Sequence, residues 1–385
     1  FTLCHLIYTD TFYMKRKWIR WVSWILLTPI ILFVILMVLL YVPPVQNLLR
    51  REVTAYASKA TGMQIQVERI DLRFPLNLLV RGVEVIQQPD TLLSLESLNV
   101  RVQAWPLIKG KVEVDEVTLG RVAVNSADLM EGMKIKGVLG RFFLQSHGVD
   151  LSNEIAIINQ AELSDTHVQL LMNDTTTTPK DTTTSAPVNW KVDLHKLKLK
   201  NVSFSMQLPA DSMRMAAHIG EAFINDAQAD LKNQFYELKQ FLLSGSSANY
   251  DTGAAKPGEG FDASHIAVRD IRIGLDSLLY KGRDMNAVIR EFSMNERSGL
   301  SITSLTGRAF SNDSIIRIPG IKLQTPHSEI DLSAQTYWEL VNIPTTGRLS
   351  AGLNAYIGKE DVMLFAGGLP DSFKEAYPFR PLVIR

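Results

Sequence analysis

The sequence predicts a mainly β protein. An N-terminal transmembrane helix and a short amphipathic helix precede an extended, curved, repetitive β-sheet that forms a groove. Three observations lead to this fold class. Val, Ile, Leu and Thr are frequent after the N-terminal region, and turn residues are plentiful. Apolar residues recur in a five-residue rhythm along much of the chain. One apolar stretch near the N-terminus is long enough to cross a bilayer.

In the five-residue rhythm, one polar residue separates a pair of apolar residues, and two polar residues follow before the next apolar pair. Its clearest copies are Val112, Val114, Val117, Leu119, Val122, Val124 and Val192, Leu194, Leu197, Leu199, Val202, Phe204. Weaker copies are Leu93, Leu95, Leu98, Val100, Val102 and Ile266, Val268, Ile271, Ile273.

The rhythm predicts long curved strands, or short strands that meet at bends, with one apolar face. Residues two apart share a face of a strand, whereas a spacing of three, as from Val114 to Val117, changes the face unless a β-bulge absorbs a residue. Two interpretations remain open: a sheet that buries this face in its own core, and an open groove whose face meets something other than protein. The candidate groove-lining residues are Val100, Val112, Val114, Leu119, Val124, Leu197, Leu199, Phe204, Ile271 and Ile273.

Composition limits the function classes. The 385 residues carry 40 basic and 40 acidic side chains, so no basic excess favours a nucleic-acid partner. Cys4 is the only cysteine, which excludes an intramolecular disulfide. This fits a reducing compartment or an extracytoplasmic protein that relies on β-packing.

Residues 18–42 form the expected transmembrane signal anchor. The stretch Ile25–Tyr41 is apolar apart from Thr28 and Pro29, and no cleavage site follows it. Aromatic residues suited to the two membrane interfaces flank it: Trp18, Trp21, Trp24 and Tyr41. The preceding basic residues, Lys15, Arg16, Lys17 and Arg20, place the N-terminus in the cytoplasm.

We therefore expect a single-pass protein of a bacterial inner membrane with its bulk in the periplasm. Residues 1–17 form the cytoplasmic leader. Residues 1–13 are unlike the start of a protein, and an upstream translation artefact is one interpretation of them.

Next comes a juxtamembrane amphipathic helix over 45–62, with Gly62 as its C-terminal cap. Residues 63–172 are the first β-repeat region. The expected strands are Gln64–Leu72, Leu76–Gln87, Leu93–Ala104, Lys111–Leu119, Arg121–Ser126, Arg141–His147, Ile155–Leu163 and His167–Met172.

Residues 173–187 form a Thr-rich segment without apolar periodicity, which predicts a disordered loop. Two Asp-Thr-Thr triplets resemble an O-glycosylation acceptor motif of Bacteroides-type bacteria, with Thr175 and Thr182 as candidate acceptors. A plain flexible insertion explains the composition equally well.

Residues 188–385 contain further β-repeats, which we expect to be truncated at the C-terminus. The expected strands are Trp190–Leu208, Arg214–Phe223, Ala227–Leu231, Gln234–Ser244, His265–Leu275, Met285–Glu296, Leu300–Phe310, Ser314–Leu323 and Ser328–Thr336. A Gly- and Ser-rich loop is expected over 244–260, short helical pieces at Asp361–Phe365 and Asp371–Tyr377, and a strand at 382–385.

No catalytic or metal-binding constellation is evident. The histidines are scattered, and no phosphate loop, dinucleotide fingerprint, nucleophile elbow or zinc-protease motif occurs. Acidic residues such as Asp115 and Asp270 fall in the polar insertions of the rhythm, where solvated bends explain them. We expect no enzyme activity, no cofactor and no metal.

Residues 14–130 resemble the start of the AsmA-like family, in particular its TamB branch. The resemblance is carried by the anchor and helix, by Thr61–Val67, by Arg81–Val85, and by Trp105-Pro106-Leu107-Ile108-Lys109-Gly110 running into alternating apolar residues. Over 140–385 the likeness is only architectural.

The resemblance implies a periplasmic β-groove that bridges the inner and outer membranes and carries phospholipid. It also implies a second role, in the assembly or secretion of outer-membrane proteins and autotransporters with an Omp85-type barrel as partner. We keep three hypotheses: a lipid conduit, a scaffold that offers sheet edges to client strands, and a structural β-domain with a closed core.

Overall fold

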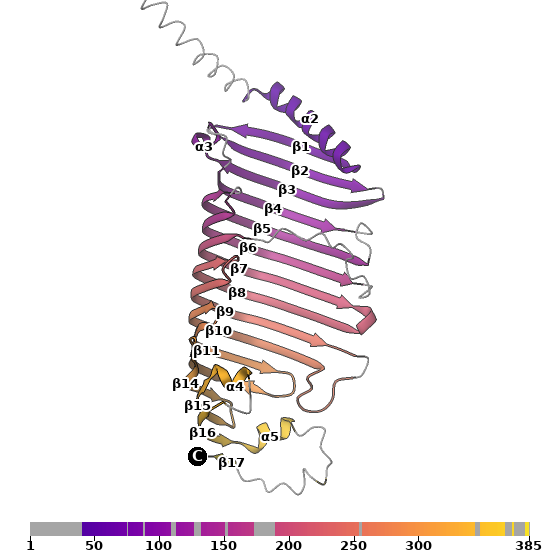
Figure 1. The fold of residues 1–385 in the computed structure, drawn as a ribbon. Coiled ribbons are helices and arrows are strands. Elements are labelled where there is room, and N and C mark those ends of the chain that lie inside the picture. Colours follow the sequence, from indigo (N-terminus) through magenta and orange to yellow (C-terminus); the bar gives the residue numbers. More distant parts are fainter. Residues whose placement is uncertain are drawn as a thin grey trace, which may run out of the picture.

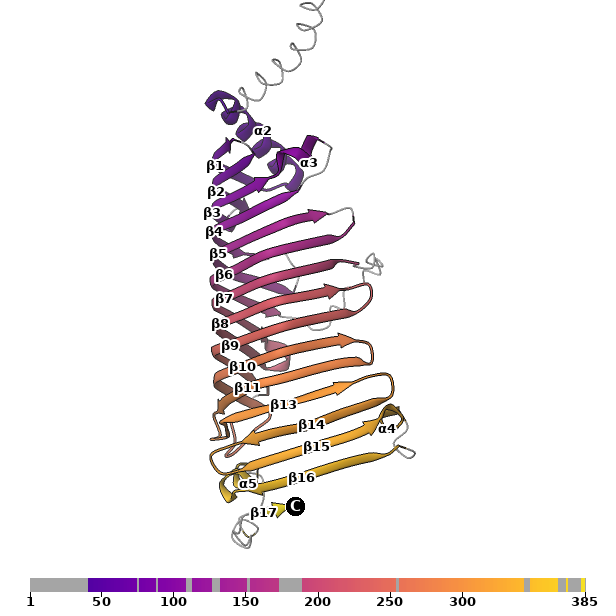
Figure 2. The same cartoon turned by 90° about the vertical axis from the view of Figure 1, so that its left-hand side faces the viewer.

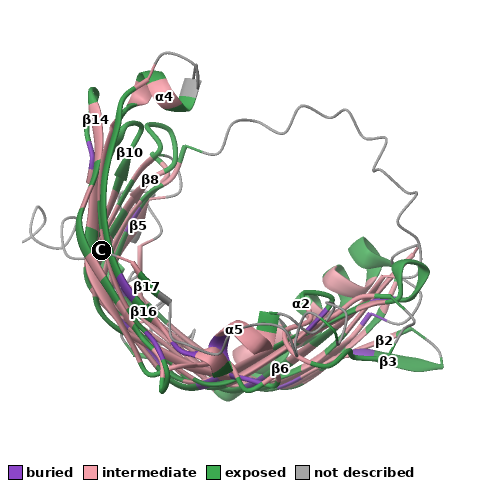
Figure 3. Cartoon of the chain, turned by 90° about the horizontal axis from the view of Figure 1, so that it is seen from below, coloured by how far each residue is buried: buried purple, intermediate pink, exposed green. Residues whose placement is uncertain are grey.

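In the computed structural model, most of the described residues belong to one sheet of 17 strands (Figures 1 and 2). The structure describes residues 41–74, 76–87, 89–108, 113–126, 132–150, 153–172, 189–253, 256–342, 347–365, 372 and 382–384. Seen along its long axis, the sheet curves into an open trough (Figure 3). The predicted mainly β class and the extended, curved sheet are confirmed.

The strands follow one another in chain order along the trough. They are β1 Gln64–Arg73, β2 Asn77–Gln87, β3 Asp90–Val102, β4 Val114–Asn125, β5 Met133–Asp150, β6 Ile155–Met172, β7 Lys191–Leu208, β8 Met213–Asp230, β9 Phe235–Asp251, β10 His265–Lys281, β11 Asp284–Glu296, β12 Ser301–Ile302, β13 Ser304–Ser311, β14 Ile315–Gln324, β15 Glu329–Tyr337, β16 Leu349–Ile357 and β17 Leu382–Ile384. The helices are α2 Pro43–Thr61, α3 Ala104–Ile108, α4 Trp338–Asn342 and α5 Lys359–Phe365, with a 3-10 turn at Pro209–Asp211.

Among the ladders that the described residues form, β6 and β7 are the only parallel pair. Ile155 lies opposite Lys191, and Leu171 lies opposite Gln207. The chain therefore leaves β6 at one rim of the trough and enters β7 at the other. Parallel neighbours need a connection of a dozen residues or more. The predicted Thr-rich loop lies in this connection, and residues 173–188 are outside the described part of the chain.

A first bend crosses ten successive strands where the ladder pairing is interrupted. At this bend β6 and β7 skip Asp165 and Asn201, which have φ of 51° and 53°. Gly82, Gly245 and Asp270 are also left-handed there. Asn201 Nδ2 donates a hydrogen bond of 2.8 Å to Asp165 Oδ1, which links β6 and β7 at this first bend. A left-handed residue breaks the alternation of a strand and turns it.

A second bend lies at another point along the same strands. Here polar side chains on neighbouring strands contact one another. His195 Nδ1 lies 3.1 Å from Asp226 Oδ1, and Lys239 Nζ lies 3.7 Å from Asp226 Oδ2. This hydrogen bond to His195 lowers the pKa of Asp226. Between the next two strands, β10 and β11, Arg290 Nη1 donates a hydrogen bond of 3.2 Å to Asp276 Oδ1. The two bends give the sheet the curvature seen in Figure 3.

The bends explain the rhythm and correct several predicted strand ends. The spacing of three from Leu199 to Val202 spans the left-handed Asn201, and that from Val268 to Ile271 spans Asp270. β10 forms the predicted bulge, because two of its residues are skipped against one of β9, and the next step of the ladder restores the register by skipping two residues of β9 against one of β10. β6 and β7 instead skip one residue each, so both strands turn without a change of register.

Four predicted interruptions were wrong, because polar bend residues resemble turns in the sequence while the strand continues through them. The breaks expected near 120, 164–166 and 224–226 lie inside β4, β6 and β8. The loop expected over 244–260 is strand as far as Asp251.

Helix α2 matches the predicted amphipathic helix and covers the free edge of β1. Gly62 ends it with a φ of 70°. Gln46 and Arg50 donate to the carbonyls of Leu72 and Glu68, and the Ile65 amide donates to Ser58 Oγ. These side chains pair backbone groups that an edge strand otherwise leaves open.

Short elements finish the trough. The helical piece predicted at Asp361–Phe365 lies within α5, and β17 falls where a strand was expected. The piece predicted at Asp371–Tyr377 lies almost entirely outside the described residues.

The predicted anchor is not described apart from Tyr41 and Val42, and the leader with its basic residues also lies outside the described part. No helix within the described residues has the length and apolar character needed to span a bilayer.

The loop before β10 is held by one carboxylate. Asp262 accepts hydrogen bonds from the amides of Gly258 and Ser264 and from His265 Nδ1. These bonds lower the pKa of Asp262 to about 2. The loop in turn supports α5, because the Phe261 amide donates to the Leu364 carbonyl and the rings of Phe261 and Phe365 lie 5.3 Å apart.

We expect this loop to loosen in acid. Because the pKa of Asp262 in the folded chain lies below its ordinary value of 3.8, the stabilisation is complete above a pH of about 4 and is lost as the pH falls through about 2. Pepsin cleavage within 256–264, measured between pH 4 and pH 2 and normalised to an unfolded peptide, should rise in the native chain. In Asp262→Ala it should be fast throughout. A native cleavage rate independent of pH would contradict this prediction.

Candidate functional site: an apolar face

Strand register aligns apolar side chains in three uninterrupted rows along the trough. The long row contains one residue from each strand except β12 and β17: Leu72, Leu78, Val100, Val117, Leu144, Ala161, Leu197, Ile224, Phe241, Leu275, Ile289, Gly307, Ile321, Leu332 and Leu353. Directly opposed residues share a face, so these side chains form one continuous strip.

Two further rows run beside the long row. The middle row is Ile70, Val80, Leu98, Leu119, Phe142, Leu163, Leu199, Ala222, Leu243, Ile273 and Phe292. The outer row, beyond the first bend, is Ile65, Val85, Leu93, Val124, Gly137, Val168, Phe204, Ala217, Ala248 and Val268. The three rows contain only apolar residues and glycine.

Most predicted groove-lining residues fall into these rows. Val100 and Leu197 belong to the long row. The middle row contains Leu119, Leu199 and Ile273, and the outer row contains Val124 and Phe204.

Three predicted residues lie elsewhere. Val114 pairs with Val102 and lies beside the long row, on the side away from the middle row. Ile271 pairs with the polar Ser246, so it stands between the middle and outer rows. Val112 is outside the described residues.

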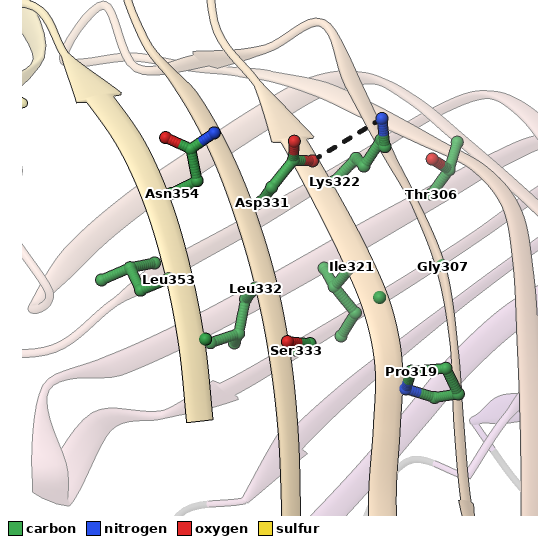
Figure 4. A pocket seen from close by; sticks show the side chains of 12 residues that line it. Thr306, Gly307, Pro319, Ile321, Lys322, Asp331, Leu332, Ser333, Leu353 and Asn354 are labelled. Carbon is green, nitrogen blue, oxygen red and sulfur yellow. Dashed lines mark ion pairs between the residues drawn. The ribbon is translucent and has the colours of Figure 1, made fainter. Parts of the chain in front are cut away.

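The rhythm missed the lower end of the long row. Ile321, Leu332 and Leu353 lie side by side on β14, β15 and β16 (Figure 4). They help to line a cavity of about 670 Å³. Gly307 completes the row, and a Cβ there would lie 2.6 Å from the Gly320 carbonyl oxygen. The only signal for these residues is apolar alternation within short strands, which does not reveal their alignment.

The opposite face beside the middle row is polar. It carries a matching row of Arg69, Arg81, Ser97, Gly120, Arg141, Ser164, Lys200, Glu221 and Ser244. Each of these residues is the sequence neighbour of a middle-row residue and therefore points the other way. The next row on this opposite face is mixed: Asp71, Leu79, Asn99, Thr118, Phe143, Glu162, Lys198, Phe223 and Leu242. The continuous apolar rows therefore lie on one face of the sheet only.

The described residues cover the apolar face poorly. No large side chain among the described residues is fully buried, and the buried hydrophobic residues are Leu92, Leu95, Ala156, Leu208, Ala222 and Ala355. Phe204 remains 41% exposed and Leu353 38% exposed. A sheet that packed against a second layer would bury such side chains almost completely.

The described residues contain no group of three or more His, Cys, Asp or Glu side chains placed to hold a metal ion. The polar side chains of the second bend form exposed pairs, which fits a structural role in the bend.

No protein-family model matches this chain, and no curated protein matches it either. What the fold itself defines is a mainly β protein built on one long, open and curved sheet.

Proposed function

We propose that the protein is an inner-membrane-anchored periplasmic conduit of the TamB/AsmA-like type, which carries phospholipid along its apolar face towards the outer membrane and so supports outer-membrane biogenesis. The observation that carries the proposal is the continuity of the three apolar rows over many strands, which no second layer formed by the described residues covers.

We assign the three rows to the concave side of the trough. Side chains on the concave side of a curved sheet converge and shield one another. The row residues Leu197 and Leu199 are half-buried, whereas Lys198 and Lys200 on the opposite face are exposed.

An apolar strip of this kind lowers the barrier to lipid transfer. Exposing an acyl chain to water costs about 0.8 kcal/mol per methylene, or roughly 10 kcal/mol and more for a long chain. Contact with the rows removes most of this cost while the headgroup stays in solvent. With strands about 4.8 Å apart, the fifteen strands of the long row would carry a chain roughly 70 Å. The process requires no ion, nucleotide or nucleophile.

The placement of the protein rests on its sequence. The apolar stretch 18–42 and the basic residues before it support a single pass with the sheet on the periplasmic side. A trough that starts at the inner membrane and runs across the periplasm has the geometry that a conduit needs.

Photo-crosslinking in intact cells tests the proposal. A photoreactive amino acid at Leu119 or Leu199 should capture phospholipid, detected by mass spectrometry of the purified protein. The matched controls, Thr118 and Lys198, precede these residues on the same strands and face the other way. Equal lipid capture from both faces would rule the proposal out.

The alternative is a scaffold that assists outer-membrane proteins or autotransporters through edge contacts with an Omp85-type barrel. The two edges of the sheet differ in how accessible their backbone is to a client strand. At β1 the backbone is covered by Gln46, Arg50 and Ser58 of α2, so a client strand could pair there only after displacing the helix. The scaffold hypothesis therefore needs the far edge, beyond β16. Client insertion that fails when this edge is capped, with lipid capture unchanged, would favour the scaffold.

A further inference from the structure

Several large apolar side chains are exposed to solvent at the β1 end of the trough. Tyr56 of α2 is 78% exposed, Phe74 in the turn after β1 is 85% exposed and Trp105 of α3 is 70% exposed. Leu48 and Val53 of α2 are more than half exposed. Helices α2 and α3 lie at the same end of the sheet in both side views (Figures 1 and 2). We call these five residues the terminal surface.

The orientation of α2 is fixed by its contacts with β1. Gln46, Arg50 and Ser58 point to the strand, where they bond its backbone. Leu48 and Tyr56 are eight residues apart, close to two helical turns, and lie on the side away from these contacts. Leu48 and Tyr56 therefore lie on the outward face of the helix, and exposed apolar patches usually mark an interaction site.

The surroundings of this surface suit a lipid bilayer. Arg51 and Lys59 are exposed on α2 and can face anionic headgroups. Tyr and Trp favour the membrane–water interface, where an apolar ring meets a polar tip. The apolar sequence 18–42 ends immediately before Pro43, and the Tyr41 ring lies 6.4 Å from the Phe74 ring.

We propose that the terminal surface lies in the headgroup region of the membrane from which the chain emerges. This inference rests on the proposed membrane anchoring and adds an orientation to it. With α2 flat on the bilayer and bound along β1, the long axis of the trough points away from the membrane. The three rows then begin beside the lipid, at Ile65, Ile70 and Leu72 of β1.

Depth-dependent quenching tests this orientation in the full chain. In a Cys4→Ser background, Tyr56→Cys and Phe74→Cys each carry an environment-sensitive fluorophore. The protein is reconstituted in vesicles of phosphatidylethanolamine and phosphatidylglycerol, with and without doxyl-labelled lipid. Leu349→Cys is the matched control, because Leu349 is 63% exposed but lies on β16 at the other end of the trough.

We expect doxyl lipid to quench the labels at positions 56 and 74 several-fold more than the label at position 349. Vesicle flotation is measured on the same samples. A protein that floats with the vesicles but shows equal quenching at all three positions overturns the orientation and leaves anchoring intact. A protein that does not float overturns both. Lipid capture at Leu119 in cells is a separate measurement, so failure of the conduit proposal is distinguished from failure of this one.

Discussion

Replacing Leu119 with aspartate should interrupt lipid movement along the trough while the sheet remains folded. Leu119 sits in the middle row between Leu98 and Phe142. An acyl chain passing a carboxylate there loses apolar contact for about four methylenes, at about 0.8 kcal/mol each. The resulting ~3 kcal/mol corresponds to a rate about 100-fold lower.

The measurement is lipid capture by photoreactive residues on either side of the substitution, at Val80 on β2 and Leu199 on β7. Capture should persist on the side where lipid enters and fall at least tenfold on the other, which also reveals the direction of movement. Thr118→Asp is the control, because it adds the same charge to the opposite face of β4. Undiminished capture on both sides of Leu119→Asp, in a protein with native circular dichroism and membrane insertion, would contradict a conduit along the rows.

Replacing Asn201 with valine should destabilise the first bend by about 2–3 kcal/mol. Asn201 has a φ of 53° and donates a hydrogen bond of 2.8 Å to Asp165 Oδ1. A β-branched residue in this left-handed conformation costs about 1–2 kcal/mol, and the lost hydrogen bond about 1 kcal/mol more. Because each strand relies mainly on its ladder neighbours, the effect should be local.

Amide hydrogen exchange of β6 and β7 measures this effect. Exchange in Asn201→Val should be about 30- to 150-fold faster than in the native chain. Asn201→Gly separates the two contributions, because glycine adopts a positive φ freely and loses only the hydrogen bond, so its exchange should rise about fivefold. Native exchange in Asn201→Val would show that the bend does not require a left-handed residue.

The sequence predicts much of the candidate site because side-chain alternation is a local property. The polar insertions at 200–201 and 269–270 coincide with the bends, and seven of the ten predicted lining residues lie in the three rows. The strand ends were less accurate, because a polar bend and a turn share the same residue types. Asp226, for example, falls in the break expected between Phe223 and Ala227 but stands inside the continuous strand β8.

By itself, then, the sequence determined that long bent strands have one apolar face, and that a helix capped by Gly62 precedes them. The tertiary structure decided which residues of different strands stand together. It alone revealed the parallel pairing of β6 with β7, the extension of the long row to Leu353, and the lack of a second layer over the rows within the described part of the chain. The physical reason is that periodicity reports the direction of a side chain, whereas register and coverage depend on contacts between residues far apart in the chain.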